Sequence, residues 1–259
     1  MSEYSNVERP FLQKLEETHW DIIDQKTGIP QDPVTSLRSS FDEVALKGEF
    51  LEFVGKINPW ATKEQLLYCY DRILIHSGKL IEANKAVFQM LRKGITLPGK
   101  NELTGEENPT IKIVDLEHWE NNHFLAINQF RVDTPTMAKK FIIPDIVCFV
   151  NGLPWIVVEC KDLDVAEPLS DAYTQIKRYS NQRLDEDDPY AQPEGKEQLF
   201  YTNLFSVITH GTEARFGSIS ADFDYYYNWT DIFPEIYRTA ETADGGVKQE
   251  VIIGGMFNH

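Results

Sequence analysis

The chain has 259 residues, of which 42% are hydrophobic and 25% are charged, proportions typical of a globular protein that can bury a full core. It has no apolar run of the roughly 18 residues that a transmembrane helix needs, and its first ten residues lack a secretory signal pattern. The three cysteines form no Cys-x-x-Cys pair, so we expect neither a zinc site nor a disulfide framework. Together these features predict a cytoplasmic protein without a membrane partner.

The net charge of −16 argues against strong autonomous binding to nucleic acid. The acid excess is unevenly distributed, because residues 131–183 hold seven basic and seven acidic side chains. A divalent cation that neutralised Asp145 and Glu159 would make this window net positive. The window is therefore compatible with weak or assisted binding to DNA.

Residues 5–19 predict the first helix. A capping box, Ser5-x-x-Glu8, would start it. Glu8 also falls on the apolar stripe of the helix, together with Phe11, Leu12 and Leu15. Glu8 therefore either caps the helix or contributes an acid to a site, and the sequence leaves both interpretations open. Residues 20–34 have the composition of a loop.

Three further helices are predicted within residues 34–94, which we treat as a helical insertion. The first spans about 40–54 behind a second capping box, Ser40-x-x-Glu43. The second begins at Thr62, and the third spans about 79–93. We expect these helices to be structural, because no residue pattern in them indicates chemistry.

After residue 95 the pattern changes to short apolar runs that are typical of strands. Two of them, 111–115 and 124–130, precede a central hairpin, and two more, 199–209 and 213–219, follow it. Between the hairpin and the last pair, a helix is predicted near 168–182. Its Gln175 and Tyr179 lie one turn apart.

The central hairpin, residues 143–161, is the stretch around which the chain is organised. Two apolar, β-branched runs flank Asn151-Gly152, a strong signal for a two-residue turn. Folding the chain at this turn brings Asp145 roughly opposite Glu159. Glu159 shares a face with Lys161, because alternate residues of a strand point the same way. Two carboxylates and an ammonium would thus meet at one end of an apolar hairpin, which is costly without a function.

Such a cluster suits the hydrolysis of a phosphodiester, which needs oxygen ligands for Mg²⁺, a positioned water and a cation near the phosphate. Asp145 and Glu159 can supply carboxylates, and the backbone carbonyl of Cys160 can add a third ligand. Lys161 can orient the water or stabilise the charge that develops on the phosphate. Taken alone, an Asp followed by Glu-x-Lys is a weak signal, because acids and lysines are common at strand ends.

The order Pro144-Asp145, Glu159-Cys160-Lys161 and Gln175-x-x-x-Tyr179 resembles the PD-(D/E)xK nuclease superfamily. More narrowly, the chain is similar to the N-terminal nuclease region of the motor (R) subunit of type I restriction-modification enzymes, a likeness that also includes Asn128-Gln129-Phe130. The resemblance implies an α/β fold with a restriction-endonuclease-like core, a mixed β-sheet flanked by helices, and an inserted helical segment near 34–94. It places a metal site at the open end of the sheet.

The resemblance also implies roles for individual residues. Asp145 and Glu159 would be catalytic metal ligands, as in the reading above, and Lys161 the catalytic cation. Glu8 would be a further acid near the metal. Gln175 and Tyr179 would brace the site or contact DNA.

For the whole enzyme, the resemblance implies Mg²⁺-dependent cleavage of double-stranded DNA at sites remote from recognition, after ATP-driven translocation. Mn²⁺ would substitute for Mg²⁺. Recognition and methylation would belong to specificity and modification subunits as partners. The sequence has no Gly-x-x-x-x-Gly-Lys-Ser/Thr phosphate loop, so ATP use would belong to motor domains of the full-length subunit.

We therefore expect residues 1–238 to form an endonuclease domain and residues 239–259 to form a connector toward helicase motors. Two other interpretations stay open. One is a PD-(D/E)xK-like scaffold that has lost cleavage and serves subunit or DNA interaction, and the other is a stand-alone repair nuclease or exonuclease. The intact set of Asp145, Glu159 and Lys161 argues against the scaffold.

Overall fold

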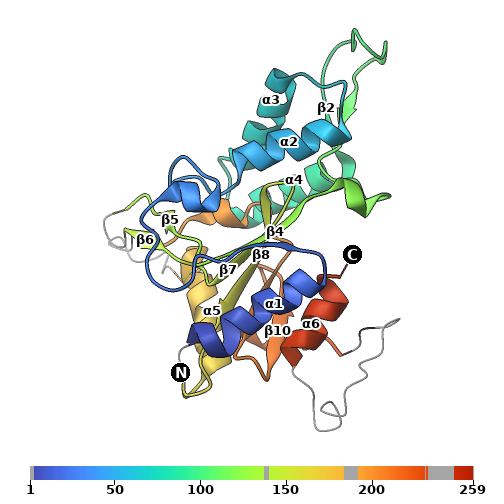
Figure 1. The fold of residues 1–259 in the computed structure, drawn as a ribbon. Helices are drawn as coiled ribbons and strands as arrows, with labels where there is room; N and C mark the ends of the chain where they lie inside the picture. Colours follow the sequence, from blue (N-terminus) through green and yellow to red (C-terminus); the bar gives the residue numbers. More distant parts are fainter. Residues whose placement is uncertain (1–2, 137–139, 184–191, 231, 233–247, 259) are drawn as a thin grey trace.

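The computed structural model describes residues 3–136, 140–183, 192–230, 232 and 248–258, and it has the expected α/β architecture (Figure 1). Its centre is a six-stranded sheet in the order β1-β4-β7-β8-β9-β10. These strands are β1 (Asp21–Ile23), β4 (Phe124–Asn128), β7 (Ile146–Val150), β8 (Leu153–Cys160), β9 (Phe205–Thr209) and β10 (Ala214–Gly217). The predicted mixed sheet is confirmed, because β1 and β4 are parallel, β8 and β9 are parallel, and the other neighbours are antiparallel.

Helices and short strands surround the sheet. The helices are η1 (Tyr4–Glu8), α1 (Arg9–Glu17), η2 (Pro33–Ser36), α2 (Lys47–Ile57), α3 (Lys63–Leu74), α4 (Leu80–Lys93), η3 (Trp119–Asn121), α5 (Pro168–Tyr179), η4 (Glu197–Phe200), η5 (Phe223–Tyr225) and α6 (Lys248–Met256). Two small antiparallel pairs join β2 (Ile95–Thr96) to β3 (Thr110–Ile111) and β5 (Val132–Asp133) to β6 (Phe141–Ile142). Within the described part of the chain, every helix is too short or too polar to cross a bilayer.

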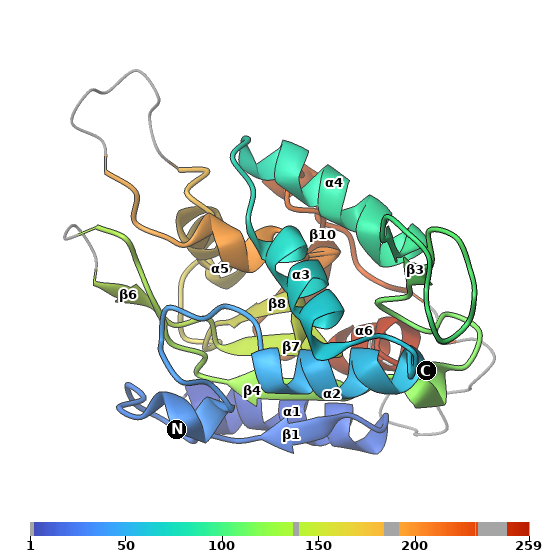
Figure 2. The same ribbon diagram turned by 90° about the horizontal axis from the view of Figure 1, so that it is seen from above.

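The sheet has two apolar faces because alternate strand residues point to opposite sides. Cys148 and Val158 lie on the face that α1 and α6 cover. Val147 and Val157 lie on the face that α5 and the helical insertion cover. Figure 2 shows the sheet between α1 on one side and α5 on the other. The central hairpin is therefore buried on both faces, and its polar residues are confined to its ends.

The helical insertion contains three helices, α2, α3 and α4, as predicted, and they lie above the sheet in Figure 1. The insertion joins the hairpin at its turn, where the Leu46 N–H donates to the carbonyl oxygen of Gly152 at 2.7 Å. α3 begins at a capping box, since Thr62 and Gln65 exchange side-chain to backbone hydrogen bonds. The insertion thus meets the hairpin at the end opposite to Asp145 and Glu159.

The first predicted helix forms, but its predicted capping box is wrong, and so is the predicted start of the second helix. Ser5 and Glu8 do not form a capping box, because both lie within the π-helical turn η1, whose first turn follows Glu3. The helix predicted from residue 40 begins only at Lys47. The Glu43 carboxylate accepts from the N–H and hydroxyl of Ser39, so residues 39–43 form a separate turn.

Two predicted strands are shorter than expected. The first stops at Ile111, because the side-chain amide of Asn58 takes the place of a neighbouring strand and bonds to the N–H and C=O of Lys112. The second begins at Phe205 rather than near residue 199, since η4 occupies the start of the predicted range. The edge strand β1 was not predicted, because it has only three residues and lies in a stretch with loop-like composition.

The end of the chain packs onto the first helix and the sheet. Residues 239–247 of the predicted connector lie outside the described residues, and Lys248–Met256 form α6. Ile252, Ile253 and Phe257 are buried among side chains of α1, and the indole N–H of Trp20 donates to the carbonyl of Phe257 at 2.8 Å. The division at residue 238 stays a prediction, and α6 packs with the elements on its N-terminal side.

Candidate active site

The central hairpin forms with the predicted turn. Asn151 and Gly152 both have positive φ, 49° and 78°, as a two-residue type I′ turn requires. Ile146 pairs with Val158, so Asp145 comes next to Glu159, as predicted. The turn alone would not give this register. A bulge between Cys148 and Phe149 shifts the pairing by one residue and brings the two acids opposite each other.

At this end of the hairpin the charged groups contact one another. Asp145 is 7% exposed, and its Oδ2 accepts the Cys160 N–H at 2.7 Å. Glu159 is fully buried, and its Oε1 accepts from the Lys161 ammonium at 2.8 Å. The same ammonium donates to the Cys160 carbonyl at 2.7 Å, on the atom predicted as a metal ligand. Among the described residues, Glu159 Oε2 has no hydrogen-bond partner although it is buried.

The first helix brings two more acids to this end of the sheet. One carboxylate oxygen from each of Glu3, Glu8 and Asp145 lies within 4.8 Å of the others. Glu8 is 2% exposed, so it is part of the site and not a helix cap on the surface. Glu3 was not predicted. Its Oε2 accepts the N–H of Asp162, directly after Lys161.

The π-helical turn explains how Glu3 and Glu8 come together. In η1 the Arg9 N–H donates to the carbonyl of Tyr4, five residues earlier. Residues five apart are then about one turn apart, whereas an α-helix of 3.6 residues per turn would separate them by about 140° around the axis. A sequence reading that assumes α-helical spacing therefore cannot pair Glu3 with Glu8.

Two amide side chains at the end of β4 hold Glu8. The Nε2 of Gln129 donates to both carboxylate oxygens of Glu8, at 3.1 and 3.0 Å, and the Nδ2 of Asn128 is 3.4 Å from one of them. The backbone N–H of Gln129 donates to the carbonyl of Asp145 at 2.7 Å. Gln129 has a φ of 49°, a left-handed conformation that places its backbone and side chain between the two acids.

Burial dominates the electrostatics of the site. It raises the pKa of Asp145 well above its ordinary value, and the neighbouring Glu159 raises it further. Burial also raises the pKa of Glu159, although Lys161 opposes the shift. Burial raises the pKa of Glu8 to about 7, against the opposing hydrogen bonds from Gln129 and Asn128. For Lys161, burial alone would lower the pKa, but Glu159 and Asp145 outweigh it, so the pKa is raised.

These groups fit a divalent cation with oxygen ligands. Glu3, Glu8 and Asp145 converge on one point, and Glu159 adds a buried carboxylate oxygen without a partner among the described residues. A cation would offset the cost of burying negative charge, which raises the pKa of Glu8, Asp145 and Glu159. Hard oxygen donors in this number suit Mg²⁺ or Mn²⁺ better than softer metals.

The predicted supporting pair lies behind the hairpin on α5. The Gln175 amide donates to the Tyr179 hydroxyl at 2.6 Å, and that hydroxyl donates to the carbonyl of Ile143 at 3.0 Å. Tyr179 is 1% exposed, so it braces the segment just before Asp145 and does not reach solvent. Contact of the partly exposed Gln175 with DNA stays a prediction.

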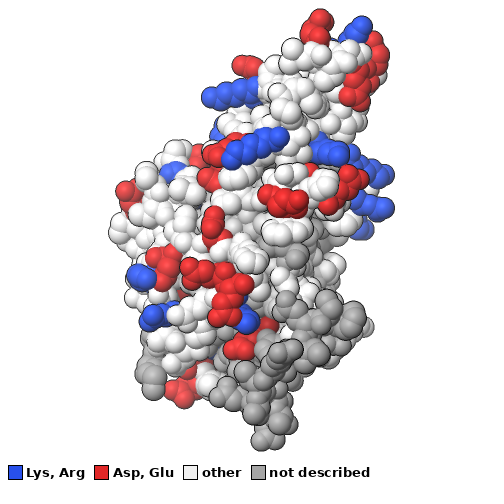
Figure 3. Space-filling view, turned by 45° about the vertical axis from the view of Figure 1, so that its right-hand side comes forward, with Lys and Arg blue, Asp and Glu red and all other residues white. Residues whose placement is uncertain are grey.

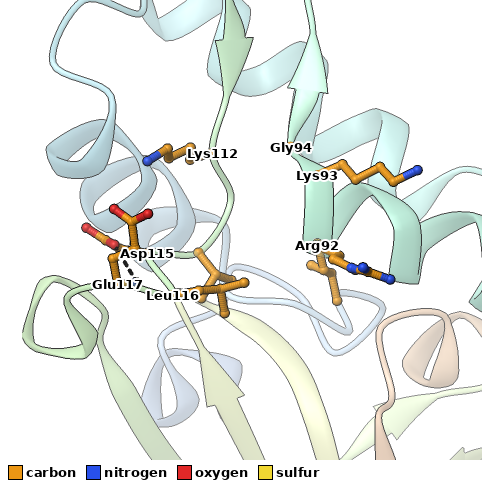
Figure 4. Close-up of a pocket in the computed structure, with 9 residues that line it drawn as sticks. Arg92, Lys93, Gly94, Lys112, Asp115, Leu116 and Glu117 are labelled. Carbon is orange, nitrogen blue, oxygen red and sulfur yellow. Dashed lines mark hydrogen bonds between the residues drawn. The ribbon is translucent and has the colours of Figure 1, made fainter.

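A cavity of about 200 Å³ lies at the C-terminal end of α4, and none of the residues of the acidic cluster lines it (Figure 4). Figure 4 shows Arg92 and Lys93 on one side of it and Asp115 and Glu117 on the other. Asp115 already serves its own turn, because its Oδ1 accepts the N–H of Glu117. Arg92 and Lys93 belong to the last turn of a helix, where cations complement the helix dipole. This cavity therefore does not compete with the acidic cluster.

A mixed sheet flanked by helices, with two acids and a lysine at the end of its central hairpin, defines a restriction-endonuclease-like nuclease fold. The chain belongs to the family of type I restriction enzyme R protein N termini, whose sequence profile matches residues 1–225.

Several curated proteins are similar to this chain. The type I restriction enzyme HindI endonuclease subunit of Haemophilus influenzae is 29% identical over 232 residues, which are 87% of this chain and 20% of that protein. The putative MjaIXP endonuclease subunit of Methanocaldococcus jannaschii is 28% identical, with the same shares covered. The EcoprrI endonuclease subunit of Escherichia coli is 30% identical over 125 residues, 46% of this chain and 35% of that protein. The chain thus spans about a fifth of the length of the first two relatives.

Proposed function

We propose that this chain is the Mg²⁺-dependent endonuclease domain of a type I restriction enzyme R subunit and hydrolyses phosphodiester bonds of double-stranded DNA. The observation that carries the proposal is the meeting of Asp145, Glu159 and Lys161 with Glu8 at one buried end of the sheet. The names of the relatives as endonuclease subunits support the same role for the region they share with this chain. Cleavage would follow ATP-driven translocation by domains outside this chain, at sites remote from recognition.

The proposed metal ligands come from two parts of the fold. Asp145 and Glu159 would hold Mg²⁺, or Mn²⁺ in its place, and Glu8 and Glu3 would add carboxylates from the first helix. The carbonyl of Cys160 is a further ligand from the same strand end. When bound, a cation at these residues would supply a Lewis acid that makes water a better nucleophile for hydrolysis.

Lys161 has an electrostatic role in this proposal. In the cation-free chain Glu159 and Asp145 raise the pKa of Lys161, so its ammonium is protonated at neutral pH. Hydrogen bonds to Glu159 Oε1 and to the Cys160 carbonyl hold the charge at the mouth of the site. A positive charge fixed there stabilises the negative charge that develops on the phosphate during attack by water.

The charge distribution supports a domain that relies on partners to hold DNA. Residues 34–94 contain nine basic and seven acidic side chains, whereas the rest of the chain contains 16 basic and 34 acidic ones. On the face in Figure 3, Lys and Arg gather toward the upper, helical part, and a run of Asp and Glu lies below it. The acid excess outside residues 34–94 disfavours autonomous binding of a polyanion, and specificity and modification subunits are the proposed partners that bring DNA to the cluster.

A non-cleaving scaffold is the alternative, and the burial of the site argues against it. Asp145 and Glu159 are buried together with their pKa values raised, which destabilises the fold at neutral pH unless a cation is bound. A protein that only binds partners gains nothing from that arrangement, because apolar residues at both positions would be more stable.

The test uses the full-length R subunit reconstituted with its partner subunits and ATP. Asp145→Asn and Lys161→Ala are each expected to reduce DNA cleavage by at least about a thousandfold while ATPase activity stays at the wild-type level. Asp164→Asn, an exposed acid three residues after Lys161, is the matched control and should cleave normally. Cleavage by Asp145→Asn or Lys161→Ala at the control rate would refute the assignment.

A further inference from the structure

α6 contributes one buried polar side chain to an otherwise apolar contact. Gln249 is 2% exposed, within the cluster that includes Val7, Ile252 and Val207. Its Nε2 donates to the carbonyl of Val7 at 3.2 Å, and its Oε1 accepts from the Thr209 hydroxyl at 2.8 Å. A buried amide without partners is destabilising, so these two hydrogen bonds fix where the side chain lies. Simple packing at this place would need only an apolar residue.

Both partners of Gln249 are directly connected to the acidic cluster. Val7 precedes Glu8 in the π-helical turn η1. The carbonyl of Thr209 accepts the backbone N–H of Lys161 at 2.9 Å, so β9 holds the end of the strand that carries the lysine. Gln249 therefore joins the helix that bears Glu8 to the strand pair that bears Lys161.

The π-helical turn makes this link important. Glu3 and Glu8 converge with Asp145 only while the turn keeps its wide, five-residue spacing. Such turns are rare in proteins, and an α-helical turn of the same residues would point the two acids apart. Gln249 binds a carbonyl of this turn from outside the helix, and so it favours the wide turn over an α-helical one.

We propose that Gln249 is a positioning residue that aligns the acids of η1 with the hairpin, and that α6 thereby controls the affinity of the site for its divalent cation. The inference rests on the proposed function, since it concerns the same cation. Displacement of α6 would withdraw the amide from Val7 and Thr209 together. The turn could then relax, and Glu3 and Glu8 would no longer face Asp145.

The test measures Mn²⁺ affinity of the 259-residue chain by calorimetry. Gln249→Leu, which keeps the side-chain volume but removes both hydrogen bonds, is expected to weaken Mn²⁺ binding about tenfold, as for other groups that orient metal ligands. Ile253→Val is the matched control. It trims a fully buried neighbour on α6 that makes no polar contact, so it should lower the thermal midpoint and leave Mn²⁺ affinity unchanged.

Thr209→Val keeps the shape of the side chain and removes one of the two bonds of Gln249, together with the contacts of the hydroxyl to the Glu213 carbonyl and the Gly211 N–H. It therefore tests the link if Gln249→Leu does not fold. We expect about a threefold loss of Mn²⁺ affinity, and no further loss when it is added to Gln249→Leu, because both changes break the same connection. Amide hydrogen exchange in the cation-free chain is a second readout. The Arg9 N–H, which closes the π turn, should exchange faster in Gln249→Leu than in Ile253→Val.

The outcomes separate this inference from the function it rests on. A wild-type chain that takes up Mn²⁺, with the same affinity in Gln249→Leu, would overturn the positioning role and leave the proposed function intact. A wild-type chain that takes up no Mn²⁺ would remove the cation site, and the inference would fall with it. An additive loss in the double variant would also contradict the inference, because it would mean that Gln249 and Thr209 act separately.

Discussion

Replacing Glu8 with Gln is expected to stabilise the cation-free protein at neutral and higher pH. Burial raises the pKa of Glu8 from its ordinary value of 4.5 to about 7. A carboxyl group whose pKa is raised by folding contributes its full stability below pH 4.5 and loses it as the pH rises through 7. Because one pKa unit corresponds to about 1.4 kcal/mol, the loss approaches about 3 kcal/mol. Gln is never charged, so Glu8→Gln should regain about 2 kcal/mol of this lost stability at pH 8. The gain is smaller than the full loss because the other acids of the cluster remain.

The assay is urea unfolding at intervals between pH 4.5 and 8.5, monitored by tryptophan fluorescence with a chelator present to keep the protein free of cations. The free energy of unfolding of Glu8→Gln should match the wild type near pH 4.5, exceed it increasingly between pH 4.5 and 7, and exceed it by a constant amount above pH 7. Glu16→Gln is the matched control, because Glu16 is an exposed acid on α1, the helix that follows directly. That control should follow the wild-type curve over the whole range.

Adding Mn²⁺ should reverse the order of the two proteins. A ligand that binds only the folded state stabilises it in proportion to its affinity, and the wild type keeps the Glu8 carboxylate as a ligand. A difference between Glu8→Gln and wild type that is the same at pH 5 and pH 8 would refute the role of burial. A variant that gains as much stability from Mn²⁺ as the wild type would refute the role of Glu8 at the metal.

Three further predictions concern the surroundings of the cluster. Tyr179→Phe leaves the carbonyl of Ile143 without its donor and should lower the free energy of unfolding by about 1–2 kcal/mol, whereas Tyr225→Phe on the surface should have no effect in the same unfolding assay. Gln129→Leu removes the hydrogen bonds that keep the pKa of Glu8 from rising further, so the decrease in the free energy of unfolding should extend to a pH above 7. A decrease that ends at the same pH as in the wild type would contradict the contact. The chain alone should bind duplex DNA only weakly at about 0.15 M salt in an anisotropy titration; tight binding that resists added salt would refute the charge argument.

The central hairpin could be predicted from sequence because its signals are local. Asn-Gly between two apolar runs fixes the turn, and the two-residue alternation fixes which side chains share a face. The predicted register of Asp145 against Glu159 is confirmed, but it depends on a bulge between Cys148 and Phe149. No residue pattern in the sequence predicts that bulge. The register prediction is thus correct for a reason that the sequence pattern did not contain.

The parts that were missed depend on local geometry that no residue pattern marks, or on contacts between distant segments. Glu43 was expected to cap a helix, but its carboxylate accepts hydrogen bonds from Ser39, and the helix begins only at Lys47. Glu3 was missed because only a π-helical turn brings it beside Glu8, and no residue pattern marks that turn. Gln249 lies 242 residues from Val7, so its contact with the first helix could not be read from local spacing.

Because the site is assembled from separate segments, it lowers the stability of the cation-free fold and can at the same time bind a cation. Glu8, Asp145 and Glu159 come from three places in the sequence, so their burial beside one another exists only in the folded state and lowers the stability of the cation-free fold. Lys161 compensates only partly, because its ammonium contacts Glu159 and leaves the oxygens of Glu8 and Asp145 unbalanced. The remaining negative charge is what a divalent cation would bind, so the energy lost in the cation-free fold reappears as cation affinity. Substitutions that stabilise this end of the sheet should therefore weaken the site, and that trade-off is a physical mark of a functional centre.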